Sequence, residues 1–101
     1  MLIDGGSRSG KEMLAYAFKK HKVGLLIGER TAGAVLGGTA RPLSDGSLLF
    51  VAVTDVRIDG EKLEGVGVSP DIEIDRKLPY SAGKDPQLRA ALEALAKAAG
   101  K

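Results

Sequence analysis

The pattern of apolar and polar positions predicts a chain that alternates between strands and helices. Residues 1–4 form an apolar start that predicts a short buried strand, ended by the glycine pair at 5–6. Glu12 follows Ser9 at the spacing of a capping box, which predicts a helix start there. The helix is expected to run to about His21, and apolar residues recur through it at helical intervals. The expected buried face comprises Met13, Leu14, Ala17 and Phe18.

The next segments predict strands and tight turns. Residues 23–27 are apolar apart from Gly24, which favours a strand buried on both faces and completes a compact βαβ unit. A glycine-rich loop is expected at 28–38, a turn at 44–46 and a long strand at 48–56. Asp59-Gly60 predicts a hairpin, and a last short strand is expected at 72–74.

The end of the chain predicts a second helix. After a linker at 78–84, Asp85 can cap the helix and Pro86 suits its first position. Gly100 is expected to end it. The expected buried stripe consists of Leu88, Leu92 and Leu95. Together these elements predict an α/β fold.

Composition narrows the class of protein. With 101 residues, 44% of them hydrophobic and 28% charged, the chain has room for one globular domain. The basic excess is two charges, the basic residues are scattered and aromatic residues are few, which argues against a nucleic-acid partner. No cysteine is present and His21 is the one histidine, so thiolate and histidine-rich metal sites are excluded. No apolar run is long enough to predict a membrane span.

The candidate nucleophile is Ser9, which stands at the predicted junction of a strand and a helix. Free amides at a helix start can stabilise a developing oxyanion, but a serine needs a base to become a nucleophile. The alternative is that Ser9 merely caps the helix. The glycine-rich turn at 28–34 either borders a site or is a plain loop, and it lacks the lysine and spacing of a phosphate-binding loop.

Glu64 is the candidate acidic residue. It lies in a glycine-containing stretch at 63–71 that includes a turn at Pro70. Its carboxylate could orient a histidine. The alternative is that Glu64 is an exposed carboxylate of the hairpin.

The order of these motifs resembles the C-terminal processing peptidase family, which includes the tail-specific proteases and the tricorn core. That family has a Ser-Ala-Ser-Ala-x-Glu element at a helix start, a strand ending in Gly-Glu-x-Thr-x-Gly, an Asp-Gly-Ser strand, a Gly-x-x-Pro-Asp element and a helix that begins Asp-Pro-Gln-Leu. The matching stretches here are 7–12, 28–33, 45–47, 67–71 and 85–88, and they are spread over nearly the whole chain.

The resemblance implies a role for each matching residue. Ser9 would be the nucleophile, and the amide of Gly10 would be an oxyanion donor. The tail-specific branch uses a lysine base at the position of Ala34, so the Ser-Lys dyad is absent. The tricorn-like branch uses a histidine held by a glutamate at the position of Glu64, and this histidine lies upstream of the matched region. His21 cannot replace it, because it follows Ser9 by about 18 Å of helix at ~1.5 Å per residue.

By resemblance, the chain is expected to be a crotonase-like βαβ unit with a β-hairpin layer and a C-terminal helix. Residues 1–101 would form the C-terminal portion of a peptidase catalytic domain in a longer protein. That protein would hydrolyse peptide bonds in unfolded or C-terminally tagged polypeptides, without a metal or cofactor. The isolated chain is expected to be inactive and prone to form homo-oligomers. The alternative is a non-catalytic binding or scaffold module of the same fold.

Overall fold

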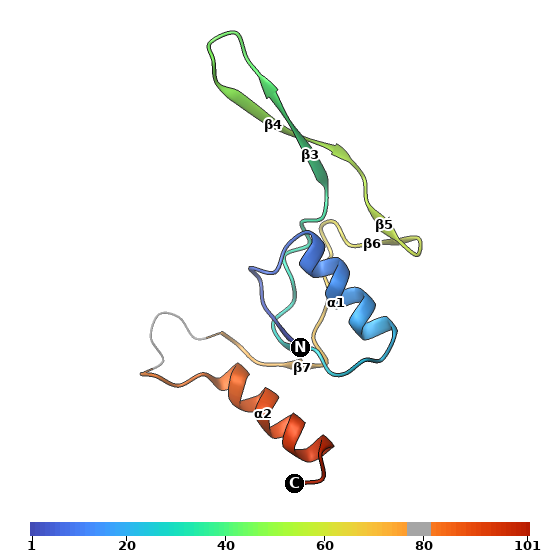
Figure 1. The fold of residues 1–101 in the computed structure, drawn as a ribbon, viewed down its shortest axis with the longest axis vertical. Coiled ribbons are helices and arrows are strands. Elements are labelled where there is room, and N and C mark those ends of the chain that lie inside the picture. The colour runs from blue at the N-terminus through green and yellow to red at the C-terminus, as the bar shows by residue number, and fades with distance from the viewer. Residues whose placement is uncertain (77–81) are drawn as a thin grey trace.

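A small parallel sheet lies at the centre of the chain in the computed structural model, which describes residues 1–76 and 82–101. Its strands are β1 (Leu2–Ile3), β2 (Ile27–Gly28) and β7 (Ile72–Glu73), in the order β1-β2-β7. Both pairings are parallel, and a helix connects β1 to β2 (Figure 1). The predicted α/β class and its βαβ unit are therefore confirmed.

That connecting helix is α1 (Gly10–Lys20), which begins and ends where the sequence predicts. Of the four residues expected on its buried face, Met13, Ala17 and Phe18 are half-buried, but the most buried positions are others. Glu12 and Ala15 are fully buried, whereas Leu14 is 60% exposed. A methyl group at Ala15 fills little space at the most buried position of the helix. Three larger α1 side chains are half-buried and pack against the core from its flanks: Met13, Tyr16 and Phe18.

The prediction of a strand at 23–27, buried on both faces, is wrong at its start. Val23 and Leu25 are 65% and 49% exposed, and burial begins at Leu26. The first positions of the predicted strand belong instead to the turn that ends α1. Lys22 adopts a left-handed φ of 51°, and the amide of Val23 donates to the carbonyl of Phe18 at 3.1 Å. Residues that close a helix in this way cannot extend at once into a strand.

An antiparallel hairpin, β3 (Gly37–Pro42) and β4 (Leu48–Thr54), stands out from the rest of the molecule as an arm (Figure 1). The sequence predicts loop for the start of β3, because glycine is unusual in strands. The expected turn at 44–46 is present, and the Asp45 carboxylate accepts bonds from the amide and hydroxyl of Ser47 at 2.9 and 2.7 Å.

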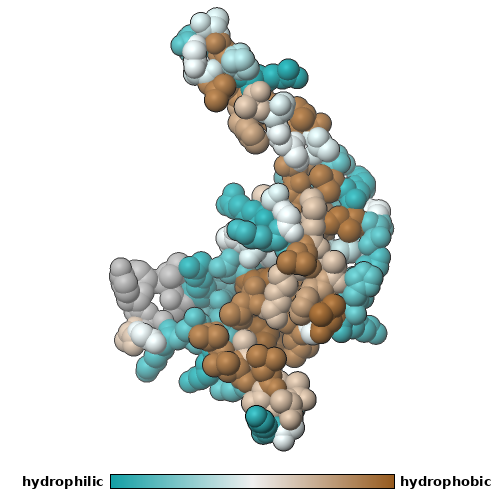
Figure 2. Space-filling model, viewed as in Figure 1, coloured by the Kyte–Doolittle hydropathy of each residue, from teal (hydrophilic) through white to brown (hydrophobic). Residues whose placement is uncertain are grey.

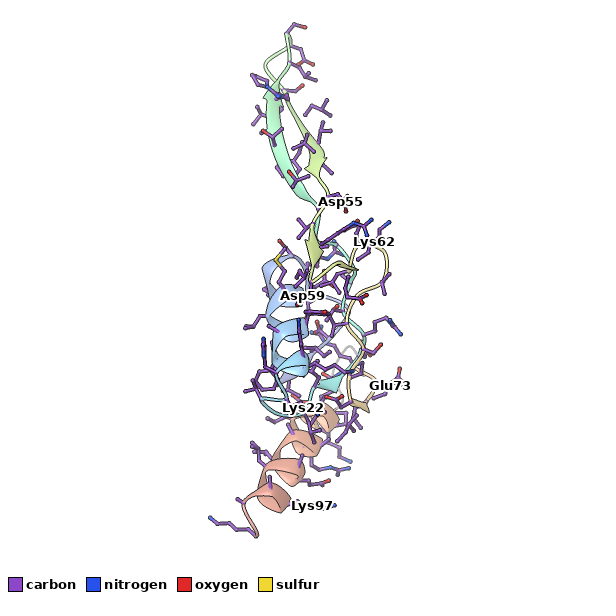
Figure 3. All side chains as sticks on the ribbon, turned by 90° about the vertical axis from the view of Figure 1, so that its right-hand side faces the viewer. Lys22, Asp55, Asp59, Lys62, Glu73 and Lys97 are labelled. Carbon is purple, nitrogen blue, oxygen red and sulfur yellow. The ribbon has the colours of Figure 1, made fainter. Side chains whose placement is uncertain are left out.

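The arm has an apolar surface that the chain itself leaves open. Every residue of β4 is exposed, including Phe50 at 73%. Figure 2 shows apolar side chains along the arm as well as over the centre of the molecule, and Figure 3 shows side chains projecting from both sides of it. The radius of gyration is 17.2 Å, against about 13 Å for a compact domain of this length.

A second hairpin joins the arm to the centre. Its strands are β5 (Arg57–Ile58) and β6 (Glu61–Lys62), and the predicted turn at Asp59-Gly60 connects them. Both turn residues have positive φ, 53° and 81°, as a two-residue hairpin turn requires. Asp59 pairs with Lys20 of α1 at 2.5 Å, and Figure 3 shows it beside that helix. This prediction is confirmed.

The core lies between α1 and the central sheet. Short pieces of segments that are far apart in the sequence form it. Asp71 illustrates how the segments are joined. Its amide donates to the carbonyl of Leu26 at 2.7 Å, while its carboxylate accepts from the Leu26 amide at 2.8 Å and pairs with Lys19 at 3.3 Å. These bonds place the start of β7 beside β2. The buried cluster comprises Ile3, Ala15, Leu26, Val35, Leu63 and Val68.

The second helix, α2 (Pro86–Ala98), is capped as predicted. The Asp85 carboxylate accepts from the amide of Leu88 at 2.9 Å, and Gly100 has the positive φ of 73° that ends a helix. Most of the predicted linker at 78–84 lies outside the described residues, which leave out 77–81. Neither described helix is long and apolar enough to cross a membrane.

The predicted leucine stripe of α2 is wrong. Leu88, Leu92 and Leu95 are 45%, 57% and 66% exposed. The half-buried face carries small residues instead, which allow α2 to approach β1 and β2. The amide side chain of Gln87 donates to the carbonyl of Ile74 at 2.8 Å and anchors the first turn. The half-buried residues of α2 are Pro86, Gln87, Ala90, Ala91 and Ala94.

Candidate active site

Ser9 has a backbone conformation that residues with a side chain rarely adopt. It occupies the N-cap of α1 with φ 57° and ψ −128°, a strained geometry that costs about 1–3 kcal/mol. Bonds on both sides maintain it. The Ser9 amide donates to the carbonyl of Ala34 at 2.9 Å and to the Glu12 carboxylate at 3.2 Å, and its carbonyl accepts from the amide of Glu12 at 2.9 Å. Serine nucleophiles of α/β-hydrolases also use a strained strand-to-helix turn.

The hydroxyl of Ser9 is exposed and donates no hydrogen bond within the described part of the chain. Ser9 and Glu12 form a capping box, in which the Ser9 side chain faces the Glu12 amide and the Glu12 carboxylate binds the Ser9 amide at 3.2 Å. Ser9 and Gly10 are both exposed, and the amide of Gly10 has no acceptor within the described part of the chain. The hydroxyl and this open amide are therefore adjacent at the positive end of a helix, where an oxyanion is stabilised.

Glu12 is the main organiser of this region, a role that the sequence interpretation missed. Its carboxylate is fully buried and accepts four hydrogen bonds. One oxygen accepts from the Thr31 hydroxyl at 2.5 Å and the Gly33 amide at 2.6 Å. The other accepts from the Ala34 amide at 2.8 Å and from Ser9. Burial raises the pKa of Glu12, but these four bonds together outweigh it and hold the pKa below its ordinary value.

Thr31 extends the Glu12 network to the glycine-containing stretch at 63–71. Thr31 is buried. Its hydroxyl accepts a hydrogen bond from the amide of Val68 at 2.7 Å, and its amide donates to the carbonyl of Val68 at 3.0 Å. The two segments approach so closely that a Cβ on Gly67 would overlap the carbonyl oxygen of Thr31. In the sequence, Thr31 belongs to the stretch that matches Gly-Glu-x-Thr-x-Gly, and Gly67 to the one that matches Gly-x-x-Pro-Asp. Those two matches were the available signal that these residues have a role in the site.

Replacing Gly67 by alanine is expected to lower the free energy of unfolding by about 3 kcal/mol or more, since it adds overpacking to backbone strain. The matched control is Gly46→Ala, because Gly46 also has positive φ but a methyl group added there would meet no atom within 4 Å. The control should cost about 1 kcal/mol, from strain alone. Denaturant unfolding of the two variants measures the difference, and equal losses would show that the contact with Thr31 has no energetic role.

Glu64 binds the same segment as Ser9, although 55 positions separate the two residues in the sequence. It is half-buried and follows the hairpin strand β6, so it is not the exposed hairpin carboxylate of the alternative interpretation. Its Oε2 accepts from the amides of Val35 and Leu36 at 2.7 and 3.2 Å. Its Oε1 has no partner within the described residues, so one oxygen of Glu64 is available to a further donor.

Glu12 and Glu64 therefore hold four consecutive amides. Glu12 binds Gly33 and Ala34, and Glu64 binds Val35 and Leu36. The same short segment accepts the amide of Ser9. The structure thus brings the predicted nucleophile and the predicted acid to one segment, which begins in the glycine-rich loop.

No base contacts the hydroxyl of Ser9 among the residues that the structure describes. His21 is the C-cap of α1, at the opposite end of the helix from Ser9, as expected. Ala34, at the lysine position of the tail-specific branch, carries a methyl group. The arrangement brings an exposed hydroxyl, an open amide and a carboxylate to one segment, and none of the described residues is placed to accept the hydroxyl proton.

The parallel βαβ unit and the serine at its strand-to-helix turn define the class of α/β proteins with a candidate serine nucleophile. Residues 1–74 match the model of peptidase family S41. The chain therefore belongs to peptidase family S41.

The relatives come from both branches of the resemblance. A Sulfurisphaera tokodaii protein described as a tricorn-like protease C-terminal subunit is 44% identical over 84% of this chain and 10% of its own length. The chloroplastic C-terminal processing peptidase of Tetradesmus obliquus is 45% identical over 74% of this chain and 16% of its own length. The crystal structure of the tricorn protease matches 99% of this chain with a TM-score of 0.81 and 34% identity. The chain spans about a tenth of that protein.

Proposed function

We propose that residues 1–101 form the C-terminal part of the crotonase-like catalytic domain of a larger serine peptidase. The observation that carries the proposal is the strained backbone of Ser9, which places an exposed hydroxyl, with no acceptor among the described residues, beside the open amide of Gly10. Family membership and the small share of each relative that the chain spans support it. The substrate class is a polypeptide, in line with the names of these relatives.

In the proposed reaction, the Ser9 oxygen attacks the carbonyl carbon of a peptide bond. A histidine from a part of the polypeptide outside this chain takes the hydroxyl proton, and the free oxygen of Glu64 accepts a hydrogen bond from the imidazolium. The amide of Gly10 donates to the oxyanion of the tetrahedral intermediate. The imidazolium then gives its proton to the leaving amine, and water hydrolyses the acyl-enzyme by the same steps.

The observations favour this triad over a Ser-Lys dyad. A methyl group at Ala34 cannot accept a proton, whereas Glu64 places a half-buried carboxylate oxygen, unpartnered among residues 1–76 and 82–101, near the segment that binds Ser9. The isolated chain is accordingly proposed to be inactive. Its exposed apolar arm, with open strand edges, supports the expectation that it forms homo-oligomers when isolated.

Covalent labelling of the full-length protein with a fluorophosphonate tests the proposal. The expected result is one adduct per molecule, located at Ser9 by fragment mass spectrometry, because an activated serine attacks phosphorus readily. Ser9→Ala should abolish the adduct, and the isolated chain should react far more slowly because it lacks the base. A folded full-length protein that forms no adduct would instead favour the binding or scaffold module.

A further inference from the structure

We propose that Glu12 is a positioning residue that holds Ser9 in its strained, reactive conformation and sets the wall of the site at 33–36. This inference rests on the proposed function, since it assumes that Ser9 is the nucleophile. Glu12 itself is fully buried, so any effect on the reaction would act through the residues that it binds.

The direction of the Ser9 amide is fixed from two sides. A positive φ turns the N–H of a residue away from its usual orientation, and such a conformation persists when the surroundings over-determine it. Here the N–H has two acceptors, the Glu12 carboxylate at 3.2 Å and the carbonyl of Ala34 at 2.9 Å. The first turn of α1 fixes the other side of the residue. These constraints fix the direction of the Cα–Cβ bond that carries the Ser9 hydroxyl.

Glu12 also determines where the Ala34 carbonyl lies. The carboxylate binds the amides of Gly33 and Ala34 at 2.6 and 2.8 Å. One side chain therefore controls both acceptors of the Ser9 amide, one directly and one through the loop. Loss of the carboxylate would release the strain at Ser9 and the wall of the site together.

The balance of donors and acceptors around Glu12 requires a carboxylate. Both Glu12 oxygens accept two hydrogen bonds each, all from N–H or O–H donors. In Glu12→Gln, one oxygen becomes an NH₂ group, which must face donors whichever way the amide is turned. Glutamine has the size of glutamate but cannot preserve the network.

The test compares steady-state kinetics of the full-length protein and its variants at temperatures where melting curves show them folded. For Glu12→Gln, kcat should fall about a hundredfold with KM changed less than about threefold, since a small misplacement of the nucleophile has an effect of this size. The rate of Ser9 labelling by a fluorophosphonate should fall in parallel, because that probe reports on the nucleophile without a peptide. A lower melting temperature with unchanged kcat per folded molecule would overturn the positioning role.

A second pair of variants decides the matter if Glu12→Gln does not fold. Thr31→Val removes the hydroxyl that binds Glu12 at 2.5 Å and should lower kcat about tenfold, whereas Thr31→Ser keeps the hydroxyl and should restore most of it. Equal kcat in the two variants would overturn the inference. Full activity of Ser9→Ala would refute the proposed function instead, so the two failures are distinguishable.

Discussion

Replacement of Ser9 by alanine is expected to reduce peptide hydrolysis by the full-length protein about 10⁶-fold in kcat, the loss typical of a serine peptidase without its nucleophile. The effect should be this large because the remaining groups, including the open amide of Gly10, can stabilise an oxyanion but cannot form an acyl-enzyme. Hydrolysis of an unfolded protein such as casein, with a melting curve to confirm folding, measures it.

The matched control is Ser7→Ala, two positions earlier in the same turn. The Ser7 hydroxyl is already engaged with Asp4, accepting from its amide at 3.2 Å and donating to its carboxylate at 3.3 Å. Its loss should loosen the turn and change turnover less than about tenfold, under ~1.4 kcal/mol in barrier. If Ser7→Ala were inactive and Ser9→Ala active, the nucleophile would be assigned to the wrong serine.

Glu64→Gln in the full-length protein is expected to lower turnover about 10⁴-fold, as the loss of an orienting carboxylate does in the comparable Ser-His-Asp triad. The structure makes this a clean substitution. The carbonyl oxygen of glutamine can keep both bonds from Val35 and Leu36, while its NH₂ group replaces the oxygen proposed to face the imidazole. The melting temperature should therefore change little.

Two controls accompany Glu64→Gln. Glu61→Gln changes an exposed carboxylate of β6 in the same hairpin region and should leave turnover within about threefold, under ~1 kcal/mol in barrier. Glu64→Ala loses the two amide bonds as well and should lower the melting temperature. If Glu64→Gln also stayed within threefold, the role of Glu64 would be confined to holding the 33–36 segment.

The contrast between Glu12 and Glu64 shows how far sequence interpretation reaches. The motifs make Ser9 and Glu64 candidates, and the structure places both at the 34–36 segment. From the sequence, Glu12 is a capping residue three positions after Ser9. That spacing describes its bond to Ser9, but it could not reveal the bonds to Thr31, Gly33 and Ala34, which lie 19 to 22 positions away.

The buried face of α2 was also beyond the sequence pattern. Leucines at helical spacing in α2 predicted a buried stripe, yet the alanine face packs and Leu88, Leu92 and Leu95 are exposed. Hydrophobic periodicity identifies an amphipathic helix, but the face that packs depends on how closely the neighbouring element can approach. In this chain the buried or half-buried helix faces carry the small side chains of Ala15 and Ala90.

The sequence by itself determined the features that depend on adjacent residues. Asp85 and Gly100 set the ends of α2, and Asp59-Gly60 sets the hairpin turn, because a cap or a left-handed turn needs only a suitable side chain or glycine within a few positions. Only the tertiary structure decided the strain at Ser9 and the division of four amides between two carboxylates. Those features arise where segments far apart in the chain meet and share the same backbone N–H donors in a buried space. The spacing of neighbouring residues does not predict which segments meet.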